Sequence, residues 1–147
     1  MNKIKVLFLC SGNTARSQMA EAFLRKEAGD RFEVYSAGLE PGEIHPYVRQ
    51  VMKETGVDIS GQYSKSFEEY MGKFHFDYII TVCDKFKKTC PSVFPDAGHI
   101  LHWSFEDPVS FEGPEEERLN KFREIRDRIR ESIKSWLKEQ GNFSDAL

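Results

Sequence analysis

This sequence has few cysteines, no long apolar run and no excess of basic residues, and each of these absences excludes a class of protein. The chain carries three cysteines in 147 residues, an odd number and too few for the disulfide framework of a small secreted protein. No apolar run approaches the roughly 18 residues of a membrane span, and the apolar stretch near the N-terminus is too short for a signal peptide. The net charge of −3 gives no electrostatic reason to bind nucleic acid or an anionic membrane. We therefore expect a cytoplasmic protein whose cysteines serve redox or catalytic chemistry.

The composition is that of a single globular domain. Apolar residues make up 39% of the chain and charged residues 31%, which is enough apolar material to bury a core without disulfide bonds. The sequence contains no internal repeat or low-complexity tract. We expect residues 1–140 to form one domain, residues 141–147 to form a C-terminal tail, and the protein to be a monomer.

The apolar pattern predicts alternating strands and helices. The expected strands cover residues 6–9, 32–37, 76–83 and 99–103. The expected helices cover residues 18–28, 46–55, 67–71 and 114–140, and Gly56 and Gly141 are expected to end the second and the last of them. The last helix has an apolar stripe at Leu119, Phe122, Ile125 or Ile129, Ile133, Trp136 and Leu137. A strand, helix and strand in succession imply parallel pairing, so we predict an α/β fold with a four-stranded parallel sheet, ordered 2-1-3-4, and helices on both faces.

The stretch from Cys10 to Ser17 has the composition of an oxyanion cradle. It joins an apolar strand to the start of a helix, where backbone N–H groups and the helix dipole attract anions. Arg16 can close the cradle with a fork of donors that matches two oxygens of a tetrahedral anion. The same field should lower the pKa of Cys10 and make it a thiolate nucleophile, with the Ser17 hydroxyl as a further donor. The oxyanion-binding residues are predicted to be Ser11, Gly12, Asn13, Thr14, Ala15, Arg16 and Ser17.

Two features of this stretch bear on its interpretation. Gly12 and Asn13 reach positive φ easily, as a tight loop requires. The alternative is that Cys10 is only a small buried residue at the end of a core strand. The placement between a strand and a helix favours the catalytic interpretation.

Asp107 is the candidate general acid. It lies in an Asp-Pro dipeptide on the loop after the fourth expected strand, at the same sheet edge as Cys10, and its carboxyl could protonate a departing oxygen. The alternative is that Asp107 only caps a turn, as aspartate before proline often does. Glu106 is a second candidate for the acid.

Cys83 and Cys90 make a thiol relay possible. Cys83 follows an apolar strand, as Cys10 does, and Cys90 comes seven residues later, so disulfide exchange among the three cysteines is conceivable. The alternatives are a buried strand residue for Cys83 and an inert loop thiol for Cys90. A zinc site with His99 and His102 is disfavoured, because structural zinc sites prefer closer cysteine spacing.

These motifs carry a resemblance to a known family. CSGNTARS at residues 10–17 resembles the phosphate loop of the low-molecular-weight protein tyrosine phosphatase superfamily, and Asp107-Pro108 resembles that superfamily's acid loop. The chain also resembles the thioredoxin-coupled arsenate reductases of this superfamily. This resemblance is carried by two cysteines separated by DKFKKT and by the segments ARSQMAEAF, VYSAGLE, MKETGVDIS and HWSFEDP. The resemblance covers most of the chain.

The resemblance implies a reaction and a partner. Cys10 would attack arsenate held by the loop amides and Arg16, and Asp107 would protonate the departing oxygen. Cys83 would then attack Cys10 and release arsenite, and Cys90 would take over the disulfide for reduction by thioredoxin. No cofactor is implied. The main alternative is a low-molecular-weight protein tyrosine phosphatase that uses Cys10 alone, and a third is a binding or redox-sensing module without turnover.

The chain also departs from the family pattern. Ala15 stands where some relatives have an additional cysteine, which the relay does not need. In potassium-binding members an Asn, a Glu, a Ser and an Asp hold the ion; Asn13, Glu21 and Ser36 match, but Lys65 stands at the Asp position. An ammonium would repel or replace a cation, so we predict no potassium site. Whether thioredoxin or a glutathione-linked protein is the electron donor stays open.

Overall fold

Four parallel strands form the centre of the protein. The computed structural model describes residues 3–83 and 94–145. The strands are β1 Ile4–Cys10, β2 Phe32–Gly38, β3 Tyr78–Thr81 and β4 His99–His102. They are ordered β2-β1-β3-β4, and every neighbouring pair is parallel. This is the predicted sheet.

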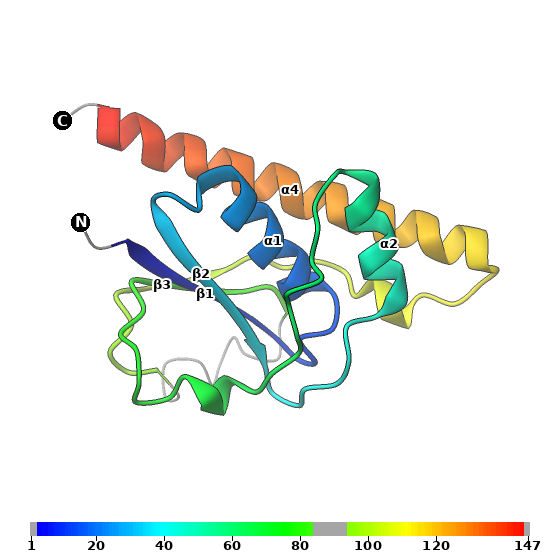
Figure 1. Cartoon of the computed structure of the whole chain (residues 1–147), viewed down its shortest axis with the longest axis horizontal. Helices are drawn as coiled ribbons and strands as arrows, with labels where there is room; N and C mark the ends of the chain where they lie inside the picture. The colour runs from blue at the N-terminus through cyan, green and yellow to red at the C-terminus, as the bar shows by residue number, and fades with distance from the viewer. Residues whose placement is uncertain (1–2, 84–93, 146–147) are drawn as a thin grey trace.

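Three α-helices cover one face of this sheet. They are α1 Arg16–Ala28, α2 Pro46–Glu54 and α4 Glu115–Asp145. In Figure 1, α4 runs across α1 and α2, and it contacts both of them. Its buried residues are Phe122, Ile125, Ile129, Ile133 and Trp136, which are members of the predicted stripe.

Alternating side chains of β1 divide the core into two parts. Val6 and Phe8 pack with the helices, whereas Leu7 and Leu9 point to the opposite face. All four are fully buried, because a central parallel strand is covered on both sides. The sequence signal of an uninterrupted apolar run therefore reflects the central position of β1.

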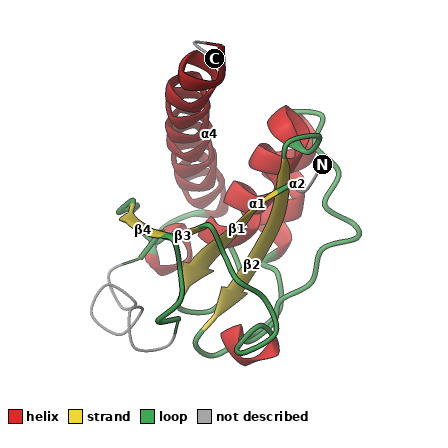
Figure 2. Cartoon of the chain, turned by 90° about the vertical axis from the view of Figure 1, so that its left-hand side faces the viewer, coloured by secondary structure: helices red, strands yellow, loops and turns green. Residues whose placement is uncertain are grey.

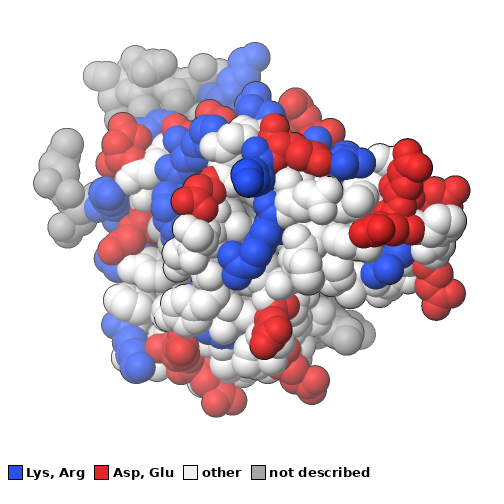
Figure 3. All heavy atoms as spheres, turned by 45° about the vertical axis from the view of Figure 1, so that its right-hand side comes forward, with Lys and Arg blue, Asp and Glu red and all other residues white. Residues whose placement is uncertain are grey.

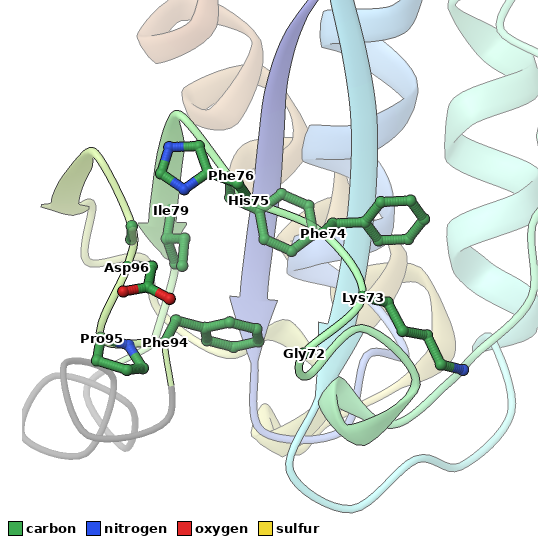
Figure 4. Close-up of a pocket in the computed structure, with 10 residues that line it drawn as sticks. Gly72, Lys73, Phe74, His75, Phe76, Ile79, Phe94, Pro95 and Asp96 are labelled. Carbon is green, nitrogen blue, oxygen red and sulfur yellow. The ribbon is translucent and has the colours of Figure 1, made fainter.

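The opposite face has a different cover. Among the described residues it is covered by the 3-10 helix η1 Phe67–Glu69 and an aromatic cluster, while the three α-helices lie on the other side of the sheet (Figure 2). Phe74, Phe76 and Phe94 of this cluster line a pocket of about 280 Å³ (Figure 4). None of the predicted catalytic residues that the structure describes, which exclude Cys90, lines that pocket.

Three element boundaries differ from the prediction. β3 covers only Tyr78–Thr81, partly because the Asp77 carboxylate accepts the Lys5 N–H at 2.9 Å where a strand bond was expected. Of the expected helix at residues 67–71, only Phe67–Glu69 is helical, as a single 3-10 turn. The expected end of α4 at Gly141 is wrong, because the helix continues to Asp145. Glycine inside a helix costs only about 1 kcal/mol relative to alanine and stops it only when a left-handed cap is formed.

No helix among the described residues is long and apolar enough to span a membrane.

Candidate active site

The loop between β1 and α1 turns its carbonyl groups outward. The carbonyls of Ser11, Gly12 and Thr14 accept N–H groups from Glu40 (2.9 Å), Gly42 (3.3 Å) and His45 (3.1 Å). Ala15 caps α1, and no described side chain bonds the helix N-terminus at this cap. This arrangement is compatible with an anion at the helix N-terminus, which stays a prediction.

Asn13 fixes the conformation of this loop. It has a positive φ of 54°, whereas Gly12, for which positive φ was also considered, does not. The buried Asn13 side chain donates to Ser17 Oγ at 2.7 Å and to Ser36 Oγ at 3.0 Å. The Ser17 hydroxyl, predicted as a donor to the thiolate, therefore has Asn13 as a partner and braces the loop.

Gly38 is a site residue that sequence reasoning treated only as the end of a strand. It pairs with Cys10 in the sheet register. A Cβ atom at Gly38 would lie 2.8 Å from the backbone nitrogen of Asn13, which is closer than van der Waals contact allows. The glycine is needed because the loop passes directly over the end of β2.

Cys10 is buried at the floor of the loop, with 3% of its surface exposed. The Cys83 side chain, by a hydrogen bond, makes the largest contribution to lowering the pKa of Cys10 to about 6, and burial opposes the shift. The Arg16 charge and the N–H groups of Ser11 and Gly12 lower the pKa further. Cys10 is therefore mainly a thiolate at neutral pH, which makes it a nucleophile.

Cys83 lies beside Cys10 because β1 and β3 are neighbours. Leu9 pairs with Thr81 in the register, and the Val82 N–H donates to the Leu9 carbonyl at 2.9 Å. Cys83 is 6% exposed, and no disulfide joins it to Cys10. The sequence placed the two cysteines at the same sheet edge, and the structure brings them together. Cys90 lies outside the described residues.

Arg16 is positioned by the loop that carries the candidate acid. It is 7% exposed, and its Nη1 donates to the Phe105 carbonyl at 3.0 Å. Its Nη2 lies 3.8 Å from Asp107 Oδ2. The buried Nε has no hydrogen-bond partner in the described part of the protein. An oxyanion in the loop would supply that partner, since a buried N–H without an acceptor is costly.

Of the two roles that the sequence left open for Asp107, the structure shows the turn cap, and the role as general acid stays a prediction. Asp107 caps the 3-10 helix η3 Pro108–Ser110, accepting the Val109 N–H and the Ser110 hydroxyl at 3.0 Å each. Its side chain is 36% exposed, and it faces Arg16 at the mouth of the loop. Glu106, the second candidate, instead pairs with Lys121 at 3.3 Å.

The two histidines considered for zinc, His99 and His102, contact other side chains. His102 Nδ1 contacts Thr81 Oγ1 at 2.6 Å, and His99 stacks on Tyr78. Within residues 3–83 and 94–145 there is no group of three or more His, Cys, Asp and Glu side chains that could hold a metal ion.

Lys65 places its ammonium where the family pattern has a carboxylate. Its Nζ donates to the Tyr63 carbonyl at 2.8 Å and lies 3.8 Å from Glu21 Oε1. Its backbone N–H donates to Asn13 Oδ1 at 3.0 Å. Burial lowers the pKa of Lys65, while Glu21 opposes that shift.

The outer surface is of mixed charge. On the face shown in Figure 3, basic and acidic side chains alternate over short distances. This fits the small net charge of −3, and the anion preference of the site comes from local groups.

The fold and the loop define an α/β protein with a buried, low-pKa cysteine in the loop between its first strand and first helix. The chain matches the low molecular weight phosphotyrosine protein phosphatase family over residues 5–142, and it belongs to that family.

Within this family the chain is similar to arsenate reductases. That of Halalkalibacterium halodurans is 40% identical over 136 residues, which are 92% of this chain and 96% of that protein. A solved arsenate reductase in the phosphate binding state is 31% identical, with a TM-score of 0.78 over 92% of this chain and 98% of its own. The thioredoxin-dependent arsenate reductase of Corynebacterium glutamicum is 36% identical, with a TM-score of 0.63 over 90% of this chain and 61% of its own.

Proposed function

We propose that this protein reduces arsenate to arsenite through Cys10, Cys83 and Cys90, with thioredoxin as the electron donor. The observation that carries the proposal is the contact between two buried thiols, Cys10 and Cys83, at the floor of an anion-binding loop. A phosphatase reaction needs only one of them. The similar arsenate reductases, one of which is thioredoxin-dependent, support the same choice.

The first step is attack by the Cys10 thiolate on arsenic. The loop N–H groups and Arg16, including its unpartnered Nε, hold the arsenate oxygens. A sulfur to arsenic bond forms and one arsenic to oxygen bond breaks. Asp107 supplies the proton with which that oxygen leaves as water.

The second step transfers two electrons to arsenic. Cys83 loses its proton and attacks the Cys10 sulfur, so that a disulfide between Cys10 and Cys83 forms as the sulfur to arsenic bond breaks. The bonding pair goes to arsenic, which changes from As(V) to As(III) and leaves as arsenite. The hydrogen bond between these side chains already places the attacking sulfur beside its target.

The third step regenerates Cys10. Cys90 attacks Cys83, which releases the Cys10 thiolate and leaves a disulfide between Cys83 and Cys90. Thioredoxin then reduces that disulfide by thiol exchange, with the protein acting as a cytoplasmic monomer. An internal resolving cysteine favours thioredoxin over a glutathione-linked donor, because the chain itself forms the disulfide that thioredoxin attacks.

The second candidate function is hydrolysis of phosphomonoesters. The loop, Arg16 and Asp107 would suffice for it, since arsenate and phosphate have similar shape and charge. This candidate is favoured by the family to which the chain belongs. It requires neither Cys83 nor Cys90, and we expect a low phosphatase activity to accompany the reductase activity.

A coupled assay tests the proposal. NADPH oxidation is followed after arsenate is added to the protein with thioredoxin and thioredoxin reductase, and Cys90→Ser is measured in parallel. We expect turnover that the variant lacks, while both proteins still hydrolyse an aryl phosphate. Aryl phosphate hydrolysis without arsenate turnover in the native protein would assign it to the phosphatase function. Phosphate binding without either reaction would indicate a binding module.

A further inference from the structure

Five buried side chains and one exposed arginine form a closed ring of hydrogen bonds behind the oxyanion loop. They come from the loop itself, from α1, from β2 and from the irregular segment before η1. The ring members are Asn13, Ser36, Glu21, Arg25, Gln62 and Gln18.

One half of the ring runs through charged groups. Asn13 Nδ2 donates to Ser36 Oγ at 3.0 Å, and Ser36 Oγ donates to Glu21 Oε1. Glu21 Oε2 accepts Arg25 Nη2, whose Nη1 donates to Gln62 Oε1 at 3.2 Å. Arg25 Nη2 also donates to the Val34 carbonyl at 2.9 Å, so this half joins α1 to β2.

The other half runs through two amides. Gln62 Nε2 donates to Gln18 Oε1 at 2.7 Å and to the Gln18 carbonyl at 3.1 Å. Gln18 Nε2 donates to Asn13 Oδ1 at 2.9 Å and to the Asn13 carbonyl at 3.1 Å. Because Gln62 uses its oxygen toward Arg25 and its nitrogen toward Gln18, the ring fixes the orientation of every amide in it.

One member of the ring, Asn13, sets the conformation of the loop. Asn13 is fully buried and has a φ of 54°, and rotation out of that conformation would leave several buried donors and acceptors without partners. Leaving such groups buried without partners destabilises the folded protein. The ring therefore opposes movement of the loop N–H groups that face the anion.

We propose that Gln62 and Arg25 are positioning residues, which act through Gln18 and Glu21 to hold Asn13 and with it the loop N–H groups. Neither residue contacts Cys10 or Arg16 through any of these bonds. The inference rests on the proposed function only in taking the loop as the oxyanion site. It does not depend on Cys83, Cys90 or thioredoxin.

The test compares Gln62→Met with a matched control. Methionine keeps the length of the side chain but removes all three hydrogen bonds of the Gln62 amide. The control, Thr55→Val, removes one hydrogen bond outside the ring, from Thr55 Oγ1 to the Met52 carbonyl at 2.7 Å at the end of α2. Both variants are measured for melting temperature, for KM and kcat with an aryl phosphate, for binding of inorganic phosphate, and for the pH midpoint of Cys10 alkylation.

A positioning role predicts effects that lost stability alone does not produce. For Gln62→Met we expect about a tenfold weaker phosphate affinity and a higher KM, with a rise in the pH midpoint as the Ser11 and Gly12 N–H groups lose alignment. Thr55→Val should lower the melting temperature and leave these values unchanged. Arg25→Lys keeps the charge beside Glu21 but loses the guanidinium hydrogen bond to Gln62. It should change the phosphate affinity, the KM and the pH midpoint in the same direction, and it provides the test if Gln62→Met does not fold.

A lower melting temperature with unchanged phosphate affinity, KM and alkylation midpoint in the Gln62 or Arg25 variant would overturn the inference. Failure of the arsenate assay would not affect it, because aryl phosphate hydrolysis and phosphate binding use the loop alone.

Discussion

At the scale of single residues, the character of Cys10 depends on groups from three parts of the chain. The loop N–H groups and Arg16 could be predicted from the sequence, because they are neighbours of Cys10 in a strand-to-helix connection. The largest contribution to the low pKa of Cys10 comes from the Cys83 side chain. The sequence indicated Cys83 as a possible attacking thiol but not its effect on this pKa. Its hydrogen bond depends on the pairing of β1 with β3, which brings residues distant in sequence into contact.

The Cys83 contribution can be measured directly. In Cys83→Ala the hydrogen bond to Cys10 is lost, so the pKa of Cys10 should rise from about 6. Cys83→Ser should keep most of the shift, because its hydroxyl can still donate. The measurement is the rate of iodoacetamide alkylation of the Cys10 peptide as a function of pH, followed by mass spectrometry. An unchanged midpoint in Cys83→Ala would show that Cys83 does not set the pKa.

Asp107 caps η3, and we predict that it is also the proton donor; an experiment can separate the two roles. Asp107→Asn keeps the oxygen that accepts the Val109 N–H, and asparagine caps about as well as aspartate, so the melting temperature should stay nearly unchanged. Loss of the proton donor should lower kcat for arsenate by roughly 10² to 10⁴-fold. Steady-state kinetics measures kcat and calorimetry measures the melting temperature. An unchanged kcat would exclude Asp107 as the acid.

At the scale of elements, the regular segments were predictable and the irregular ones were not. The strand and helix around the loop followed from their apolar patterns, and His45 caps α2 as expected. Gln62 and Lys65 lie in a segment without periodicity, and their side chains reach buried partners only because that segment folds back beside α1. No local pattern in the sequence signals such a path. The same limit explains the missed contact between Gly38 and the loop.

The ammonium of Lys65 leads to a prediction about monovalent cations. Because it lies within 3.8 Å of Glu21, a second cation between Glu21, Ser36 and Asn13 would be repelled. The melting temperature should therefore be the same in sodium chloride and potassium chloride at equal ionic strength. A potassium-specific rise would contradict the prediction, and a comparison with Lys65→Asp would show whether a carboxylate there creates potassium dependence.

At the scale of the whole molecule, the sheet topology explains why the site lies where it does. The order β2-β1-β3-β4 places the carboxyl ends of β1 and β3 side by side, and ligands bind at that edge in parallel sheets. The order could be predicted from the βαβ pattern and the resemblance. The aromatic cover of the second face could not, because it depends on tertiary contacts of loop residues such as Phe74 and Phe94.

The low pKa of Cys10 also links the site to global stability. The pKa of the Cys10 thiol falls from 9.0 to about 6 on folding. Ionisation of this thiol therefore stabilises the folded state fully above pH 9, and the stabilisation is lost as the pH falls toward 6. Urea unfolding with a reductant should therefore give a free-energy difference between the native protein and Cys10→Ser that grows from pH 6 to pH 9. A constant difference over this range would contradict the low pKa.

The central claim is that arsenate receives its electrons from Cys10 and Cys83. The most direct test is a single turnover of reduced Cys90→Ser with arsenate and no thioredoxin, because the relay then stops after its second step. We predict one arsenite released per protein molecule and a disulfide between Cys10 and Cys83, identified by peptide mapping. Absence of arsenite, or arsenite released without that disulfide, would contradict the relay.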